Sequence, residues 1–161
     1  MIILVMGVSG AGKSTIGNLL AISLGWEFKD ADDFHTADNI EKMSQGIPLS
    51  DADRAPWIKK IQTAIDSWLK DDKNVVLACS ALKNSYRKLL LRDEEKVKSV
   101  YLKGSFELIE KRLQQRQNHY MKSNLLLSQF ETLEEPVEAV FVDAGEATEV
   151  IINTIKKSLE I

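Results

Sequence analysis

Glycine, lysine and serine residues close to the start of the chain have the spacing that phosphate binding requires. Residues 7–14 read Gly-Val-Ser-Gly-Ala-Gly-Lys-Ser, which fits the pattern G-x-x-x-x-G-K-[ST] at every fixed position. Glycines let successive main-chain N–H groups turn toward one centre, and the start of a helix adds partial positive charge there. We expect Lys13 to reach the terminal phosphates of a nucleotide and the Ser14 hydroxyl to hold Mg²⁺. The pattern predicts a nucleoside triphosphate site formed by Gly7, Ser9, Gly10, Ala11, Gly12, Lys13, Ser14 and Thr15.

Carboxylates and a histidine form a second candidate group, at residues 30–35, which read Asp-Ala-Asp-Asp-Phe-His. Asp30 and Asp32 are two residues apart, so on an extended loop their side chains project in the same direction. One carboxylate can then assist the metal, and the other can orient or deprotonate an acceptor hydroxyl. The alternative is a solvated acidic turn that caps the next helix. His35 taken alone is more typical of a polar loop residue than of a catalytic one.

Basic residues supply the third kind of chemistry, because the net charge of −3 offers an anionic substrate no general attraction. Lys83 and Arg87 are spaced i, i+4 at the start of a helical pattern, a spacing that suits binding of a carboxylate or phosphate. The alternative for this pair is an exposed basic helix face. Arg54 is a further candidate anion ligand, and its alternative is a surface arginine paired with Asp51 or Asp53.

Arg112 and Arg116 repeat the i, i+4 spacing at the end of a later helical pattern. A mobile segment with two arginines can surround the transferring phosphoryl oxygens and exclude water from them. The alternative is that these charges complement the carboxyl end of a helix.

Apolar runs alternate with helical patterns along the chain, and these elements must position the candidate side chains. We expect strands at 2–6, 26–29, 74–79, 97–103 and 139–142, and helices at 13–24, 36–45, 54–69, 83–91, 105–117 and 147–159. The continuously apolar run at 74–79 is typical of a parallel sheet covered on both faces. The order predicts an α/β fold, a doubly wound parallel five-stranded sheet with helices on both faces. In such a sheet ligands bind beyond the carboxyl ends of the strands, where the candidate groups gather.

Length and composition exclude several other classes of protein. The 161 residues suffice for one domain with a proper core, and Cys79, the single cysteine, excludes an internal disulfide and fits a reducing compartment. The apolar run at 2–6 is too short for a membrane span or a signal peptide. We therefore expect one cytoplasmic domain over residues 1–161, with no nucleic acid or membrane partner.

Longer blocks of sequence carry a resemblance to a known family. The most specific are Asn-Ile-Glu-Lys-Met at 39–43, Cys-Ser-Ala-Leu-Lys at 79–83 and Ser-Gln-Phe-Glu at 128–131. Over nearly its whole length the chain resembles the short P-loop gluconokinases, carbohydrate kinases related to shikimate and nucleoside monophosphate kinases. It departs from them at Ala31, where the family usually has glycine, and at Thr36, where it usually has proline. The departure at Ala31 removes no functional group.

The resemblance implies a P-loop NTPase-type kinase that uses ATP and Mg²⁺ to convert D-gluconate to 6-phosphogluconate. It implies a small mobile lid around residues 112–130 and a homodimer. Asp32 would position and deprotonate the acceptor hydroxyl, with Lys13 and Arg116 as the other catalytic residues. Asp30 would join Ser14 at the metal. ATP would also contact Arg112, Arg116 and Asp143, and the sugar acid would contact Asp32, His35, Arg54, Lys83, Arg87 and His119.

Two alternatives remain at this level. A kinase for another hydroxy acid, such as shikimate, fits the same motifs, whereas a nucleotide acceptor would require more arginines near the second group. A regulatory protein that only binds a nucleotide is the alternative from another class. A guanine-dependent switch normally carries Asn-Lys-x-Asp, and the sequence has only the reversed pair at residues 73 and 74.

Overall fold

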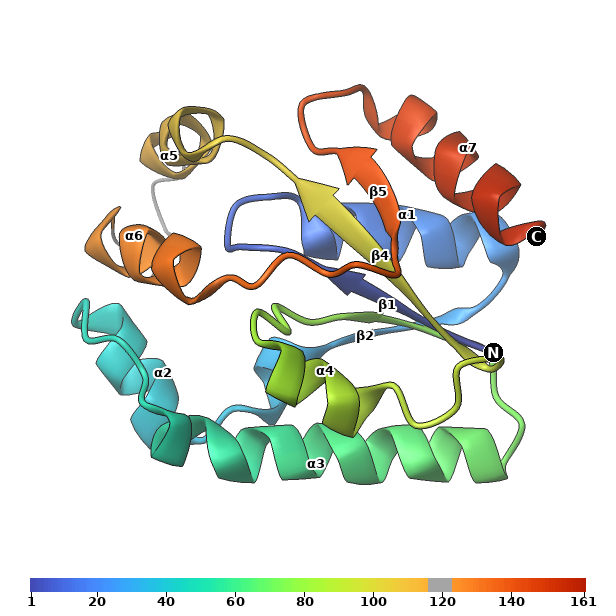
Figure 1. Ribbon diagram of the computed structural model, residues 1–161, viewed down its shortest axis with the longest axis horizontal. Helices are drawn as coiled ribbons and strands as arrows, with labels where there is room; N and C mark the ends of the chain where they lie inside the picture. Colours follow the sequence, from blue (N-terminus) through green and yellow to red (C-terminus); the bar gives the residue numbers. More distant parts are fainter. Residues whose placement is uncertain (116–122) are drawn as a thin grey trace.

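The computed structural model describes residues 1–115 and 123–161. Five parallel strands form one sheet in the order β2-β3-β1-β4-β5 (Figure 1). The strands are β1 (Ile2–Met6), β2 (Glu27–Asp30), β3 (Val75–Ala78), β4 (Val97–Lys103) and β5 (Val140–Asp143). The predicted parallel five-stranded sheet is confirmed. The predicted bounds of β1 and β4 are the observed ones, whereas β2, β3 and β5 each begin one residue later than predicted.

Helices cover both faces of this sheet, as the alternating pattern predicts. The described residues form α1 (Lys13–Leu24), α2 (Ala37–Ser44), α3 (Asp51–Lys70), α4 (Asn84–Leu90), α5 (Phe106–Gln114), α6 (Ser123–Thr132) and α7 (Thr148–Leu159). Figure 1 shows α1 and α7 on one side of the sheet and α3 and α4 on the other. None of the helices in this described part combines the length and apolar character that crossing a membrane requires.

The two faces of the sheet bury two separate cores, because successive strand residues point to opposite faces. On β1, Ile3 and Val5 pack with the apolar residues of α1 and α7. Ile2 and Leu4, on the same strand, pack with the apolar residues of α3 and α4. β1 is therefore buried along its whole length, and its carboxyl end is a rigid support for the loop that follows.

Helix α3 begins three residues earlier than predicted, because its first turn is a complete capping box. The main-chain N–H of Asp53 donates to Ser50 Oγ at 3.1 Å, and the N–H of Ser50 donates to Asp53 Oδ2 at 3.0 Å. This reciprocal pair satisfies two donors at the helix start. The cap fixes Arg54 in the first turn of α3, close to the carboxyl ends of the strands.

The acidic segment after β2 is not the extended loop that the sequence led us to expect. Residues 31–34 form a 3₁₀ helix, η1 (Ala31–Phe34), whose N-cap is Asp30. Asp30 Oδ1 accepts the main-chain N–H of Asp32 at 3.0 Å, and this local bond favours a turn over an extended chain. The extended loop, on which Asp30 and Asp32 were expected to project in the same direction, is therefore not what the chain forms.

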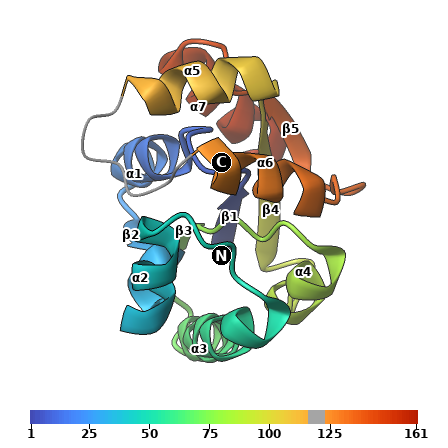
Figure 2. The same ribbon diagram turned by 90° about the vertical axis from the view of Figure 1, so that its left-hand side faces the viewer.

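Three helices surround the carboxyl ends of the strands, where ligands of such sheets bind. Figure 2 turns this end toward the viewer, with α2, α5 and α6 around it. The predicted lid around residues 112–130 covers the end of α5 and most of α6, and its intervening residues lie outside the described ones. The sequence pattern did not predict α6 as a separate helix.

Candidate active site

The glycine loop joins the carboxyl end of β1 to the start of α1. Gly10 and Gly12 have φ angles of 83° and 100°, a left-handed conformation that favours glycine. A Cβ atom at Gly10 would also approach the side chains of Ile109 and Leu113 to within 3.0–3.1 Å. Lys13 Nζ donates to the main-chain oxygen of Val8 at 3.0 Å, so the ammonium group lies against the loop. The local structure is the phosphate-binding arrangement that the motif predicts.

A hydroxyl and a carboxylate meet beside this loop. Ser14 Oγ donates to Asp30 Oδ2 at 2.5 Å, from the first turn of α1 to the end of β2. Hard oxygen donors of this kind suit Mg²⁺, which in nucleotide enzymes takes one or two protein oxygens and completes its shell with phosphates and water. The residues thus fit the predicted metal site, and Asp32 lies within η1, two residues beyond Asp30.

A pocket opens next to the glycine loop and brings together residues from distant parts of the chain. Its lining residues come from the glycine loop, η1, α2, α3, α4 and α6. The polar residues that line it and bear on chemistry are Ser9, Lys13, Asp32, His35, Arg54 and Gln129. A cation at the phosphate loop, a carboxylate and an arginine therefore share one pocket.

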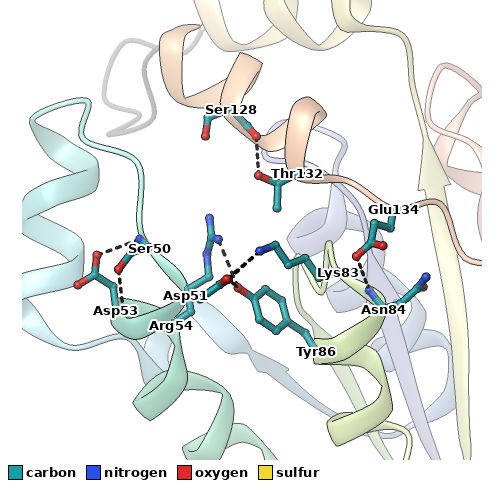
Figure 3. A network of polar contacts seen from close by, with 10 residues as sticks. All are labelled: Ser50, Asp51, Asp53, Arg54, Lys83, Asn84, Tyr86, Ser128, Thr132 and Glu134. Carbon is teal, nitrogen blue, oxygen red and sulfur yellow. Dashed lines mark hydrogen bonds and ion pairs between the residues drawn. The ribbon is translucent and has the colours of Figure 1, made fainter.

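Arg54 lines this pocket and, in the described part of the chain, contacts an aromatic ring rather than pairing with a carboxylate. Its Nη1 donates to Tyr86 Oη at 3.4 Å, and its guanidinium carbon lies 5.9 Å from the centre of the Tyr86 ring (Figure 3). Asp51 pairs instead with Lys83, at 2.8 Å, and Asp53 pairs with Lys42, at 2.9 Å. Within the described chain, Arg54 has no ion-pair partner. The alternative of a surface arginine paired with Asp51 or Asp53 is excluded.

Lys83 does not line the pocket. It lies at the N-cap of α4 with an extended backbone, so the i, i+4 rule for helix faces does not apply to it. Its Nζ donates to both carboxylate oxygens of Asp51, at 2.8 and 3.0 Å, and Tyr86 Oη donates to the same carboxylate (Figure 3). The hydrogen bonds from Lys83 and Tyr86 lower the pKa of Asp51 below its usual value. The charge of Lys83 is thus already compensated.

Arg87 is buried outside the pocket, with 4% of its surface exposed. Its guanidinium donates to the main-chain oxygens of Ala81, at 2.7 Å, and Glu134, at 2.5 Å, and to Asn84 Oδ1. These bonds tie α4 to the segment that follows α6. The structure does not bring the predicted pair of Lys83 and Arg87 to a common ligand.

Asp32 and His35 also line the pocket. Asp32 is well exposed, and its Oδ1 is 4.0 Å from Nε2 of His35, whose side chain is only 5% exposed. The imidazole stacks on Trp57, with 4.2 Å between ring centres and 9° between planes. Burial, opposed by Asp32 and Asp30, lowers the pKa of His35 below its ordinary value. Burial therefore favours the neutral form of the imidazole.

A second groove lies on the other side of the glycine loop. Arg112 Nη2 donates to the main-chain oxygen of Ala144 at 2.6 Å, and Nη1 to that of Ala11 at 3.5 Å. Gly12, Thr15, Arg112 and Ala144 are among the residues that line this groove. Asp143, at the end of β5, accepts the N–H of Gly145 at 2.8 Å and lies next to Ala144. Arg116 and His119 lie outside the described residues.

Sequence reasoning missed several residues that shape the pocket. The main-chain N–H of Ser9 donates to Gln129 Oε1 at 2.7 Å, which joins the glycine loop to α6 across 120 residues. Trp57 supports His35, and Tyr86 supports Arg54. Gln129 lies within one of the family-specific blocks, and that was the only signal available for it. No spacing rule identifies the partners of Trp57 or Tyr86.

Comparison with known proteins identifies the family. The shikimate kinase family profile matches residues 9–160. The gluconokinase of Arabidopsis thaliana is 46% identical, covering 96% of this chain and 89% of that protein. A solved gluconokinase from Sinorhizobium meliloti 1021 is 41% identical with a TM-score of 0.86, covering 98% of this chain and 90% of that one. A solved sugar kinase from Janibacter sp. HTCC2649 is 39% identical with a TM-score of 0.92, covering 99% and 94%.

A more distant structure shows how far the fold extends beyond these relatives. The solved shikimate kinase from Aquifex aeolicus vf5 is 20% identical with a TM-score of 0.58, covering 99% of this chain and 96% of that one, and shares the fold alone. The sequence resemblance to relatives named gluconokinase is much stronger. The chain is a kinase of the P-loop type and belongs to the gluconokinases, within the shikimate kinase family.

Proposed function

We propose that this protein transfers the γ-phosphoryl group of ATP to the primary hydroxyl of D-gluconate, giving 6-phospho-D-gluconate. The observation that carries the proposal is the single pocket lined by Lys13, Asp32 and Arg54. Phosphoryl transfer needs a cation at the phosphates and a group that orients the acceptor hydroxyl. A sugar acid adds a carboxylate, for which an unpaired arginine is the matching partner. Gluconokinases are also the relatives with 40–47% identity.

The phosphates of ATP would bind the main-chain N–H groups of the glycine loop, with Lys13 at the β- and γ-phosphates. Mg²⁺ would be held by Ser14 and, directly or through water, by Asp30, and its charge would neutralise that of the phosphates. Arg112 and the segment around Asp143 would lie beside the adenine, because the groove they flank adjoins the outer side of the loop.

Asp32 would accept the proton of the attacking hydroxyl, since its carboxylate lies in the pocket on the side of the loop that Lys13 occupies. Arg54 would bind the carboxylate of gluconate, with Tyr86 holding its guanidinium group. His35 would face the acceptor hydroxyls. Lys83 and Arg87 are left out of this proposal, because Asp51 and main-chain oxygens already occupy them.

Shikimate is the alternative substrate, and the shikimate kinase profile that matches the chain is the observation in its favour. Shikimate also offers a hydroxyl and a carboxylate, so Asp32 and Arg54 do not discriminate against it. A protein that only binds a nucleotide would need neither group. A coupled assay of ADP release with gluconate, shikimate, glucitol and nucleoside monophosphates tests the proposal. We expect the highest kcat/KM for D-gluconate, and a higher value for shikimate or a nucleotide would overturn it.

We further propose that the protein works in the cytoplasm as a homodimer, as the family resemblance implies. The lone Cys79 is buried, and burial raises the pKa of its thiol to about 12, so the protein needs no oxidising compartment. Light scattering of the eluted protein tests the dimer, and a monomer mass at working concentration would contradict it.

A further inference from the structure

Asn39 is a buried polar residue next to the pocket, with 3% of its surface exposed. It lies in the first turn of α2, where its main-chain N–H donates to the N-cap Thr36 at 3.2 Å. Its side-chain Nδ2 is 2.9 Å from the main-chain oxygen of Asp53. A carbonyl oxygen can only accept a hydrogen bond, so the atom that faces it must be the amide nitrogen. The orientation of the Asn39 amide is therefore fixed by chemistry.

The same nitrogen also faces His35. Asn39 Nδ2 lies 3.4 Å from His35 Nδ1. An amide nitrogen carries two hydrogens and no acceptor site, so Nδ1 of His35 must be the acceptor. A neutral imidazole has one protonated nitrogen, and with Nδ1 unprotonated the proton is on Nε2. Protonation of Nδ1 would place two N–H groups against each other.

The other ring nitrogen, Nε2, lies near Asp32, which lines the pocket. His35 Nε2 lies 4.0 Å from Asp32 Oδ1, a gap too long for a direct hydrogen bond and wide enough for both to contact one hydroxyl. The charged groups around the imidazole are Asp30 at the end of β2, Asp32 on η1 and Arg54 on α3. Trp57 fixes the plane of the ring by stacking, and is itself held by donation from Nε1 to the Ala31 main-chain oxygen at 2.7 Å.

We infer that Asn39 is a positioning residue that fixes the Nε2–H tautomer of His35, so that this N–H donates to the acceptor hydroxyl that Asp32 deprotonates. The inference rests on the proposed function for the role of the hydroxyl, and on the geometry alone for the tautomer. The hydroxyl oxygen would accept the N–H of His35 and donate its proton to Asp32. These two contacts would fix the direction of the lone pair that attacks the phosphorus. Asn39 itself does not line the pocket.

NMR of the unliganded protein tests the tautomer without any turnover. The chain has two histidines, so a His119→Gln variant leaves His35 as the only imidazole signal. Long-range ¹H–¹⁵N spectra near neutral pH then report which ring nitrogen is protonated. We expect a protonated Nε2 and an unprotonated Nδ1. A proton on Nδ1 overturns the inference, and leaves the proposed function untouched.

Two matched substitutions of His35 test the role of the N–H. The amide nitrogen of His35→Gln reaches the position of Nε2, whereas that of His35→Asn reaches only the position of Nδ1. Both variants lose the ring and its stacking on Trp57. We expect kcat with gluconate to fall by about tenfold in His35→Gln and by about a hundredfold or more in His35→Asn. Equal losses in the two variants would overturn the role of the Nε2–H.

Substitutions of Asn39 separate positioning from packing. Asn39→Asp and Asn39→Leu both remove the donor to the Asp53 oxygen, but only the carboxylate can accept from Nδ1 and favour the imidazolium. We expect Asn39→Asp to raise the pKa of His35, measured by an NMR titration of the variant. Asn39→Leu is the control, with a lower melting temperature and no upward shift of the His35 pKa. The same His35 pKa in both variants would contradict the inference.

Discussion

The Arg87 guanidinium donates a hydrogen bond to the main-chain oxygen of Glu134, at 2.5 Å, and so joins α4 to the segment that follows α6. Two further bonds support this junction. The N–H of Glu134 donates to the oxygen of Leu82 at 2.8 Å, and the N–H of Asn84 donates to Glu134 Oε1 at 3.1 Å (Figure 3). Since α6 carries Gln129 into the pocket, the junction sets the position of that side of the site.

Arg87→Met should therefore change stability rather than substrate affinity. The substitution keeps much of the packing of the side chain but leaves the oxygens of Ala81 and Glu134 without their donor. We expect a loss of about 1–3 kcal/mol in the free energy of unfolding, measured by urea denaturation. KM for gluconate should stay within a few-fold of the wild-type value. A stable variant with a greatly raised KM for gluconate would show instead that Arg87 binds the substrate carboxylate.

Arg54→Met should have the opposite profile. Arg54 lines the pocket and makes no ion pair in the described structure, so the fold does not depend on its charge. A charge-assisted contact and the cost of leaving the bound carboxylate unpaired together predict a rise of about a hundredfold in KM for gluconate. KM for ATP should change little, and the ability to distinguish gluconate from neutral glucitol should be lost. If gluconate KM is unchanged, the carboxylate binds elsewhere.

Local patterns explain why much of the fold could be predicted. The glycine motif and the strand before it depend on residues within one turn or one strand of each other. The parallel sheet follows from the alternation of apolar runs with helices. The η1 turn was missed because the decisive bond joins the Asp30 side chain to a main-chain N–H two residues on.

The candidate site was predicted less well, because its electrostatics depend on pairs that are far apart in the sequence. Among the described residues Arg54 forms no ion pair, because Lys83, 32 residues from Asp51, occupies one neighbouring carboxylate and Lys42 occupies the other. Arg87 is buried against the main-chain oxygen of Glu134, which lies 47 residues away in the sequence and so could not be paired with it by spacing. No spacing rule distinguishes Arg54, Lys83 and Arg87. The sequence therefore identified all three as candidate anion ligands but could not show which of them lines the pocket.

Lys13→Ala should abolish turnover while the fold remains intact. Lys13 Nζ donates to the main-chain oxygen of Val8 in the loop, and Lys13 lines the pocket. Loss of a cationic contact to the transferring phosphoryl group should cost about 3 kcal/mol or more, which is at least a hundredfold in kcat. Circular dichroism provides the check on folding. Near-normal turnover in a folded variant would show that the reaction does not need the Lys13 side chain.

Asp32→Asn tests whether the carboxylate accepts a proton or only binds the sugar. The amide has the same shape but cannot act as a base, so kcat should fall by about a hundredfold or more. KM for gluconate should change much less, because the charge matters most as the hydroxyl attacks. A variant with normal kcat and a raised KM for gluconate would show that Asp32 binds the substrate and does not accept the proton.

Stability toward acid should depend on the capping box of α3. Hydrogen bonds from Lys42 and the main-chain N–H of Ser50 lower the pKa of Asp53 from 3.8 to about 2. A carboxyl whose pKa is lower in the folded state stabilises the fold above its unfolded pKa. That contribution is lost as the pH falls from about 4 to about 2, because the unfolded chain takes up the proton first.

The free energy of unfolding of Asp53→Asn should therefore depend less on pH in the acid range than that of the wild type. We expect the variant to be less stable than the wild type near pH 7, and the difference to shrink as the pH falls toward 2, because protonated Asp53 has also lost its charge. Ser50→Ala is the matched control, since it removes the other half of the cap, about 1 kcal/mol, without a titrating group. Urea midpoints of the three proteins across this pH range make the measurement. A difference between Asp53→Asn and wild type that stays constant with pH would show that the Asp53 charge does not stabilise the helix start.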